Sequence, residues 1–318
     1  MNIDIIAAES MGVRGLCCLV TLPDRRIVID PGVALGIRRH GLLPHPLQIA
    51  VGHSVRGKIV QVLEAATDVV FSHFHGDHVP LVDANPYQLS VQALPPCFRE
   101  LHGWCMSGDG LSAGMSQRFQ DLAVLLGANL QVAEGRSEGP LSFSPSVPHG
   151  AAGSSTGSLM MTRIEMNKQV FVHASDIQLL DAATVDRVID WCPDIVLAAG
   201  PPLYLDRLGR AGREYAWGNA KRLVQTIDTV ILDHHIMRST EGAVWLDELS
   251  AAAGRRVYCA ADFMGQPRRL LEAERVQLYA EMPVPDGWHD NYASGRVDIT
   301  GYFDATGYKA RDPDMAAG

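Results

Sequence analysis

The stretch Ser72-His73-Phe74-His75-Gly76-Asp77-His78 gathers three imidazoles and a carboxylate within six residues. It follows the apolar run Asp68 to Phe71, which predicts a strand that stops at the cluster. His73 and His75 are two residues apart, so in extended backbone their rings leave on the same side and can converge on one ion. Asp77 and His78 follow at once, at the expected start of a helix that turns them towards a second ion. The alternative is a solvated polar loop, but without a metal such a cluster would be an electrostatic and solvation burden.

The cluster is better suited to a catalytic than to a structural metal. A closed structural zinc needs four ligands and normally draws on thiolates, of which this region has none. The chain has six cysteines without a C-x-x-C pair, which we interpret as reduced and mostly buried thiols: Cys17, Cys18, Cys97, Cys105, Cys192 and Cys259. We therefore expect an open metal site.

Length and composition limit the class of protein. A chain of 318 residues with 47% hydrophobic composition can bury a large core, and we expect one domain over residues 1–303 with a flexible tail at residues 304–318. No run of about 18 apolar residues could span a bilayer, and the start lacks the basic flank of a signal peptide, which predicts a cytoplasmic protein without membrane partners. The formal charge of −9 disfavours long nucleic acids and leaves room for a small anionic ligand.

The order of elements predicts an α/β fold with two similar halves. Short apolar runs at residues 3–8, 16–22, 26–30 and 68–72 read as strands, with a helix at 55–66. The second half offers strands at 141–147, 158–166, 169–173, 195–199 and 229–232, with helices at 177–191, 218–226 and 267–280. Two β-rich halves with outer helices imply a four-layer αββα sandwich.

A loop-rich insertion is expected at about residues 79–128, near the site. Periodicity is weak there, and prolines and glycines interrupt it. The insertion is either a lid or pocket wall over the site, or a structural excursion with its own small core.

H-x-H-x-D-H after a hydrophobic strand resembles the signature of the metallo-β-lactamase superfamily. The resemblance implies two divalent metal ions, zinc or else manganese or iron. His149, in Val147-Pro148-His149-Gly150, matches the third histidine of the first metal site, beside His73 and His75. Asp176, in His173-Ala174-Ser175-Asp176, matches the carboxylate that bridges two ions. Asp30, in Ile29-Asp30-Pro31-Gly32, matches an early strand-end aspartate that orients the histidine loop.

The last expected ligand is a histidine at the end of a late strand, and Leu232-Asp233-His234-His235 offers two. We predict His234, which stands one residue beyond the strand end as His73 does. Together with Asp77 and His78 it would hold the second ion. His235 then serves as a proton donor, a substrate contact or a hydrogen-bonded neighbour of a ligand.

Further motifs extend the resemblance over nearly the whole chain. They are Glu9 to Arg14, Asp30 to Leu35, Ser175 to Gln178, Gly200-Pro201-Pro202 with Tyr204-Leu205, and Leu232 to His235. They resemble an uncharacterised subgroup of the superfamily, best known from archaea and regarded as predicted metal-dependent hydrolases. This similarity implies the fold and the metal ligands, and it carries no assigned substrate.

Other polar features have two interpretations each. The segment Gly150 to Gly157 could present backbone N–H groups and hydroxyls to an anion, or simply connect two strands. Five arginines are candidate clamps for phosphate or carboxylate, or else surface and structural charges: Arg14, Arg38, Arg39, Arg213 and Arg238. Six more histidines have no assigned role: His40, His45, His53, His102, His173 and His289.

The resemblance implies a hydrolytic mechanism. Two ions bridged by Asp176 and a water would lower the pKa of that water for attack, with Asp77, His235 or an insertion residue as the acid. The first functional hypothesis is hydrolysis of a small phosphodiester or cyclic phosphate, and the second is hydrolysis of an ester, thioester, lactone or amide. A di-iron redox protein fits less well, because such members usually carry an acidic residue where His75 stands and an added flavin domain. A non-catalytic metal-binding protein has no need of an open two-metal site. The sequence does not decide the metal, the substrate or whether the chain forms a homo-oligomer.

Overall fold

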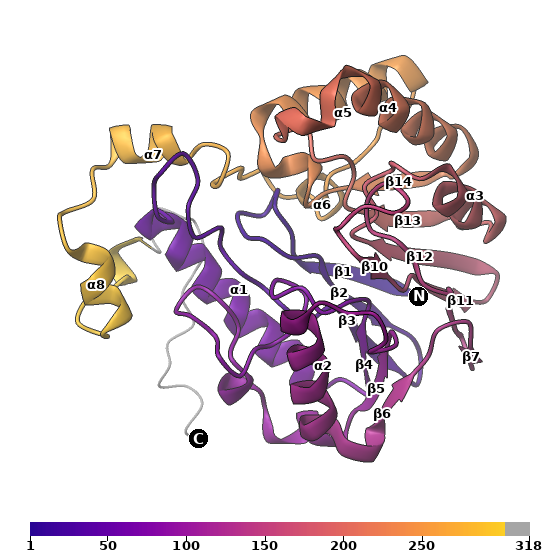
Figure 1. Cartoon of the computed structure of the whole chain (residues 1–318), viewed down its shortest axis with the longest axis horizontal. Helices are drawn as coiled ribbons and strands as arrows, with labels where there is room; N and C mark the ends of the chain where they lie inside the picture. Colours follow the sequence, from indigo (N-terminus) through magenta and orange to yellow (C-terminus); the bar gives the residue numbers. More distant parts are fainter. Residues whose placement is uncertain (303–318) are drawn as a thin grey trace.

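Two six-stranded sheets lie between outer layers of helices in the computed structural model, which describes residues 1–302 (Figure 1). The tail predicted at residues 304–318 lies outside the described residues. The first sheet runs in the order β1 (Asn2–Ala7), β2 (Cys17–Thr21), β3 (Arg26–Ile29), β4 (Asp68–Phe71), β5 (His102–Cys105) and β6 (Leu130–Val132). The second runs in the order β14 (Thr229–Leu232), β13 (Ile195–Ala198), β12 (Gln169–Ser175), β11 (Thr162–Met166), β8 (Leu141–Phe143) and β7 (Ser137–Glu138). A small ribbon pairs β9 (Val147–Pro148) with β10 (Ser158–Leu159).

The helices form the two outer layers. On the side of the first sheet lie α1 (Pro46–Glu64) and α2 (Ala113–Leu126), and on the side of the second lie α3 (Ala182–Asp190), α4 (Gly209–Thr226) and α5 (Thr240–Ala253) (Figure 1). Shorter helices follow: α6 (Ala260–Phe263), α7 (Arg275–Glu281) and α8 (Trp288–Ala293). Buried apolar side chains from both halves form one continuous cluster. This is the four-layer αββα arrangement that the sequence predicted.

Parallel pairing brings the carboxyl ends of several strands to one edge. In the first sheet β3, β4, β5 and β6 are mutually parallel neighbours, and in the second β12, β13 and β14 are. Asp30 follows β3, Ser72 follows β4, Asp176 follows β12 and His234 comes soon after β14. The candidate site residues therefore lie at the strand ends where the two sheets meet, the usual place for sites in layered α/β folds.

Several helix limits differ from the prediction. The first helix begins at Pro46 instead of Val55, because the His45 ring accepts a hydrogen bond from the Leu47 N–H at 3.1 Å and caps the helix. Histidine is not among the usual capping residues, so the sequence did not mark this start. The helix expected at residues 177–191 is confined to α3, since residues 177–181 form a loop against the site. The helix α5 was not predicted.

The insertion is also shorter than expected. Residues 79–101 are loop-rich, with two short 3₁₀ turns. Within the predicted limits of 79–128, however, β5 belongs to the first sheet and α2 to its helix layer. The sequence of β5, His102-Gly103-Trp104-Cys105, has no β-branched residue and so did not show strand propensity. Gly103 lies close to its neighbours there, because a Cβ would lie 2.9 Å from methyl groups of Leu126 and Leu130, which would have to shift.

Gly32 allows the histidine loop to pass close to the turn after β3. A Cβ at Gly32 would lie 2.2 Å from the backbone N of Val79 and 2.3 Å from the carbonyl carbon of His78. Both neighbours are backbone, so no side chain can rotate away. The close approach fixes the position of the metal-ligand candidates in the loop.

We predict that Gly32→Ala lowers the free energy of unfolding by about 3 kcal/mol, because overpacking against backbone forces the loop to move. Urea denaturation measures the change. Gly57→Ala is the matched control, because Gly57 lies in α1 and its added Cβ would meet nothing within 4 Å. The free energy of unfolding of this variant should rise by about 0.5–1 kcal/mol. Equal stability of the two variants would contradict the role of Gly32.

Candidate metal centre

Seven residues that the sequence predicted as ligands come together in two groups. Each group has its candidate ligand atoms within 4.8 Å of one another. The first group is His73, His75, His149 and Asp176, and the second is Asp77, His78 and His234. Both are drawn from strand ends and loops that are far apart in the sequence, so only the fold unites them.

The first group centres on the Nε2 atom of His73. This atom lies 2.9 Å from Nδ1 of His75 and 3.6 Å from Oδ2 of Asp176. The same Oδ2 atom lies 3.0 Å from Nε2 of His149. On the far side of the His149 ring, the Gln178 amide lies 3.2 Å from Nδ1 and orients the imidazole.

The second group faces the other oxygen of Asp176. Its Oδ1 lies 3.2 Å from Nε2 of His78 and 3.5 Å from Nε2 of His234. Nε2 of His234 is also 3.5 Å from Oδ2 of Asp77. One carboxylate thus lies between two sets of nitrogen atoms, with one oxygen towards each set.

The donor set fits divalent cations. Oδ1 of Asp176 and Nε2 of His235 are buried at the centre and have no hydrogen-bond partner among the described residues. Buried polar atoms without partners are costly, and a cation between them would remove the cost. Imidazole and carboxylate ligands suit zinc, manganese and iron. A metal can therefore be held by these side chains.

Burial and mutual contacts set the protonation of the cluster. Burial lowers the pKa of His75 and of His234 to about 4, and it also lowers the pKa of His73 well below the usual range. These imidazoles are neutral at neutral pH and keep a lone pair for a metal. Burial opposes the charge of His78 too, but the adjacent Asp176 and Asp30 raise its pKa well above the usual value. A bound cation would take the place of that proton.

Asp30 holds the histidine loop in place. Its carboxylate accepts hydrogen bonds from the Ser72 N–H at 2.8 Å, the Ser72 hydroxyl at 2.7 Å and the Ser175 hydroxyl at 2.8 Å. Nδ1 of His78 lies 3.0 Å from Oδ2 of Asp30 and donates to it, which turns Nε2 towards the centre. The Ser72 hydroxyl also lies 2.8 Å from Nδ1 of His73. The sequence predicted the orienting role of Asp30 but not the two serines.

Backbone strain marks the same strand ends. Asp30 and Ser175 each have φ of 49°, and His234 has φ of 70°. Non-glycine residues in this left-handed region cost about 1–3 kcal/mol each and persist only where their surroundings enforce them. Here the strained turns aim three side chains at the centre.

His234 and His235 both reach the centre, where each approaches a different oxygen of Asp176. His234 belongs to the group of Asp77 and His78, whereas Nε2 of His235 lies 3.3 Å from Oδ2 of Asp176. Nδ1 of His235 lies 3.4 Å from the Tyr204 hydroxyl. Asp176, His234 and His235 also have candidate ligand atoms within 4.8 Å of one another, so the choice of His234 as the ligand stays a prediction. His235 has a further polar neighbour in Tyr204.

Comparison with known proteins places the chain in a family. No family model matches it. It is 45% identical over 303 residues to a UPF0282 protein of Methanosarcina mazei, covering 95% of this chain and all of that protein. The chain belongs to the UPF0282 family. A UPF0282 protein of Thermococcus gammatolerans is 33% identical over 292 residues, which cover 88% of this chain and 95% of that one.

A solved structure confirms the fold of this family member. The isothiocyanate hydrolase from Delia radicum gut bacteria superposes with a TM-score of 0.50 at 15% identity, covering 81% of this chain and 95% of that one. The fold is that of the metallo-β-lactamase superfamily, as the sequence predicted. Among residues 1–302, no helix has the length and apolar character needed to cross a membrane.

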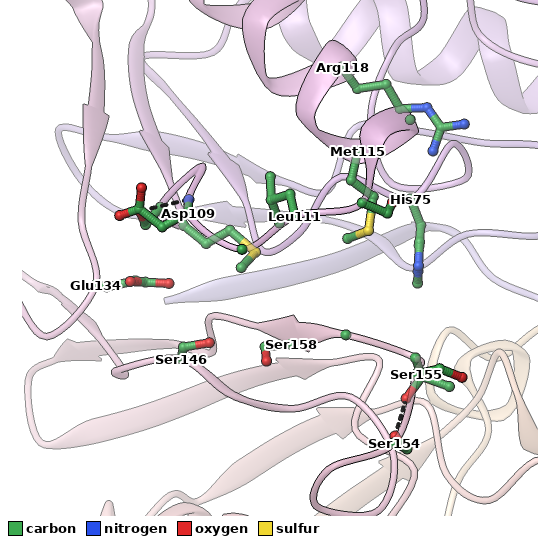
Figure 2. A pocket seen from close by; sticks show the side chains of 17 residues that line it. His75, Asp109, Leu111, Met115, Arg118, Glu134, Ser146, Ser154, Ser155 and Ser158 are labelled. Carbon is green, nitrogen blue, oxygen red and sulfur yellow. Dashed lines mark hydrogen bonds between the residues drawn. The ribbon is translucent and has the colours of Figure 1, made fainter.

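A cavity of about 900 Å³ opens beside His75 (Figure 2). One wall carries Leu111, Met115 and Arg118 from the segment before and within α2, and the opposite wall carries serines between residues 146 and 158 (Figure 2). Met106 also lines the cavity. This wall lies within the predicted limits of the insertion, but it is formed by α2 and the segment before it and not by the loop-rich residues 79–101. Arg118 donates to the Phe74 carbonyl at 3.0 Å, close to the histidine loop. No sequence pattern marks Arg118, because only the position of α2 brings it to the cavity.

The other predicted features are divided between the site and the rest of the fold. The Gly150–Gly157 segment connects β9 to β10 and lines the cavity with Ser154, Ser155 and Thr156. Of the five candidate arginines, only Arg238 contacts the ligand groups; Arg14 pairs with Glu272, Arg38 with the Gly41 carbonyl, Arg39 with the Arg238 carbonyl and Arg213 with Glu241. His173 donates to the Leu16 carbonyl at 2.9 Å. The other unassigned histidines are in none of the metal-holding groups of residues 1–302.

Replacing each of the two adjacent histidines by alanine tests which of them is a metal ligand. We predict that His234→Ala loses about one bound transition-metal ion per chain, because the second group then keeps only Asp77 and His78 besides Asp176. His235→Ala should keep nearly the parent metal content and serves as the matched control. Elemental analysis of folded protein in metal-replete buffer measures both, and the reverse pattern would show that His235 is the ligand.

Proposed function

We propose that this chain is a metal-dependent hydrolase with a two-ion centre. His73, His75 and His149 would hold one ion, Asp77, His78 and His234 the other, and Asp176 would lie between them. The observation that carries the proposal is the position of the Asp176 carboxylate, whose two oxygens face separate ligand groups. Zinc is the proposed metal, with manganese or iron as alternatives for the same donors.

Ions bound there would supply Lewis-acid activation of a water and of the attacked group. The chain's own residues set the surroundings of that chemistry. Asp176 is nearly fully buried, and burial alone would raise its pKa, but the imidazoles of His78, His234 and His235 hold the pKa well below the usual range. It therefore remains an anion, as a carboxylate between two cations must.

Proton movement has a defined route at the edge of the centre. The hydroxyl of Tyr204, a half-buried residue, lies 3.4 Å from Nδ1 of His235, and Nε2 of that ring lies 3.3 Å from Oδ2 of Asp176. We propose that His235 carries a proton between the leaving group and Tyr204. Asp77 is the second candidate, because its side chain is 18% exposed while that of Asp176 is 2% exposed.

The lining of the cavity suits a small anionic substrate, and we propose that the substrate is a small phosphodiester or cyclic phosphate. Arg118 lines the cavity next to His75, and serine and threonine hydroxyls line the facing wall (Figure 2). A guanidinium with hydroxyl donors suits phosphate oxygens. The apolar side chains Met106, Leu111 and Met115 support the second candidate, hydrolysis of an ester, thioester, lactone or amide with an apolar part.

Removing the negative charge of Asp176 tests the proposed two-ion centre. With a substrate found by screening phosphodiesters, thioesters and lactones, Asp176→Asn should lower kcat/KM by about a hundredfold or more, because electrostatic stabilisation at the reacting atoms is lost. Asp186→Asn removes the same charge from an exposed residue of α3 and should change nothing. A folded Asp176→Asn variant with full metal content and parental activity would contradict the proposal.

Loss of the cavity arginine tests the substrate class. We expect Arg118→Gln to raise KM for an anionic phosphodiester roughly tenfold, the cost of one charge-assisted hydrogen bond, without loss of metal. Neutral lactones or esters should be affected far less. Arg99→Gln, at an exposed residue of the 3₁₀ turn Pro96–Glu100, is the control. An equal KM change for charged and neutral substrates would argue for the second candidate.

A further inference from the structure

A guanidinium lies directly against the second ligand group. Nη2 of Arg238, the last residue of the 3₁₀ turn Ile236–Arg238, is 2.6 Å from Nε2 of His234 and 3.3 Å from Oδ2 of Asp77. These are two of the three atoms proposed to hold the second ion. The Arg238 residue is 6% exposed, so it is part of the interior and not a surface charge.

The guanidinium is held in this position from behind. Its Nε donates to Oε2 of Glu9 at 3.3 Å, and its Nη1 donates to the Tyr204 hydroxyl at 3.3 Å. Glu9 is itself buried, and the Arg39 side chain donates to the Arg238 carbonyl at 3.1 Å. The charge of Arg238 is therefore shared between Glu9 behind it and Asp77 of the second ligand group.

Arg238 and a metal ion compete for the same atom. A guanidinium has donors and no acceptor, so Nε2 of His234 accepts at 2.6 Å with the lone pair that an ion would use. The Gly15 N–H approaches the other ring nitrogen, Nδ1, at the longer distance of 3.3 Å. A zinc–imidazole bond is about 2.0–2.1 Å long, shorter than the present contact, and two adjacent cations repel each other.

The first ligand group has no such competitor. Within residues 1–302, the side-chain contacts of His73, His75 and His149 are made by histidine, aspartate, serine and glutamine only. The two groups share Asp176, but only the second has a guanidinium hydrogen-bonded to a ligand nitrogen; Arg118, near His75, donates to the Phe74 carbonyl instead. The first group should therefore have a higher affinity for a cation than the second.

We propose that Arg238 makes the two ligand groups differ in their affinity for a metal ion. The first group binds its ion tightly, whereas the second binds an ion weakly because Arg238 must first move away from His234. The inference rests on the proposed two-ion centre and adds the control of its second position. Occupancy of that position would follow the metal supply, while the first ion stays bound.

The test is a titration of the metal-free full chain with Zn²⁺, in which binding is measured by calorimetry or by competition with a chelator. The parent should show two dissociation constants that differ by at least roughly tenfold. The variant Arg238→Met with Glu9→Gln removes the guanidinium and its buried counter-charge together, which avoids an unpaired buried carboxylate. Its second constant should be at least roughly tenfold tighter, with the first changed by less than about threefold.

Two matched controls isolate the guanidinium. Glu9→Gln alone should not tighten the second site, and neither should Arg39→Gln, which removes a neighbouring arginine that touches no ligand. Two equally tight sites in the parent would overturn the inference even if the double variant did not fold. A second site that is unchanged or lost in the folded double variant would overturn it as well. Absence of any Zn²⁺ binding by the parent would instead contradict the proposed function, and the inference with it.

Discussion

The carboxylate of Asp30 joins the two sheets at the edge where the histidines lie. It accepts from Ser72 after β4, from Ser175 at the end of β12 and from Nδ1 of His78, so three strand ends and the histidine loop share one anion. Each of these buried donors would cost about 1–3 kcal/mol if left without a partner. Burial opposes the charge, yet the contacts with His78 and Ser72 keep the pKa of Asp30 below its usual value. Which nitrogen of His78 faces the centre, and hence the second ligand group, depends on this residue.

Charge balance explains how so many buried polar groups coexist. Asp77, Asp176 and Asp30 are anions within one cluster, and the surrounding imidazoles compensate their charge only in part. The protonated His78 ring and the Arg238 guanidinium supply positive charge at the second ligand group. The side of His73, His75 and His149 has no arginine or lysine contact among the described residues. A cation is therefore needed most at the first group, and at the second it must replace charges already present.

The residues that form the two candidate ligand groups could be predicted from the sequence because their signals are local. His73, His75, Asp77 and His78 form one motif at a strand end, and His149, Asp176 and His234 each follow short apolar runs in the order that the superfamily uses. The fold followed from the same alternation of strands and helices. The strand β5 was missed because its residues have little strand propensity, and only its neighbours β4 and β6 stabilise it.

The sequence alone could not show which arginines lie at the site, because their positions depend on partners that are distant in the chain. Arg238 was one of five candidates, and it is fixed at the site by Glu9, 229 residues away in the chain. Arg118 reaches the cavity only through the packing of α2 on the first sheet. The sequence distinguished His234 from His235 only by position relative to the strand, whereas in the fold the two rings approach different oxygens of Asp176 beside the strained turn at His234. Such features arise from tertiary packing and have no local pattern.

The most direct measurement is a crystal structure of the protein soaked in Zn²⁺, with anomalous diffraction data collected on both sides of the zinc absorption edge. The account predicts a strong peak among His73, His75 and His149, and a second, weaker one among Asp77, His78 and His234, with the Asp176 carboxylate between them. Absence of zinc from the His73 group, or peaks only at surface residues away from Asp176, would contradict the two-ion centre.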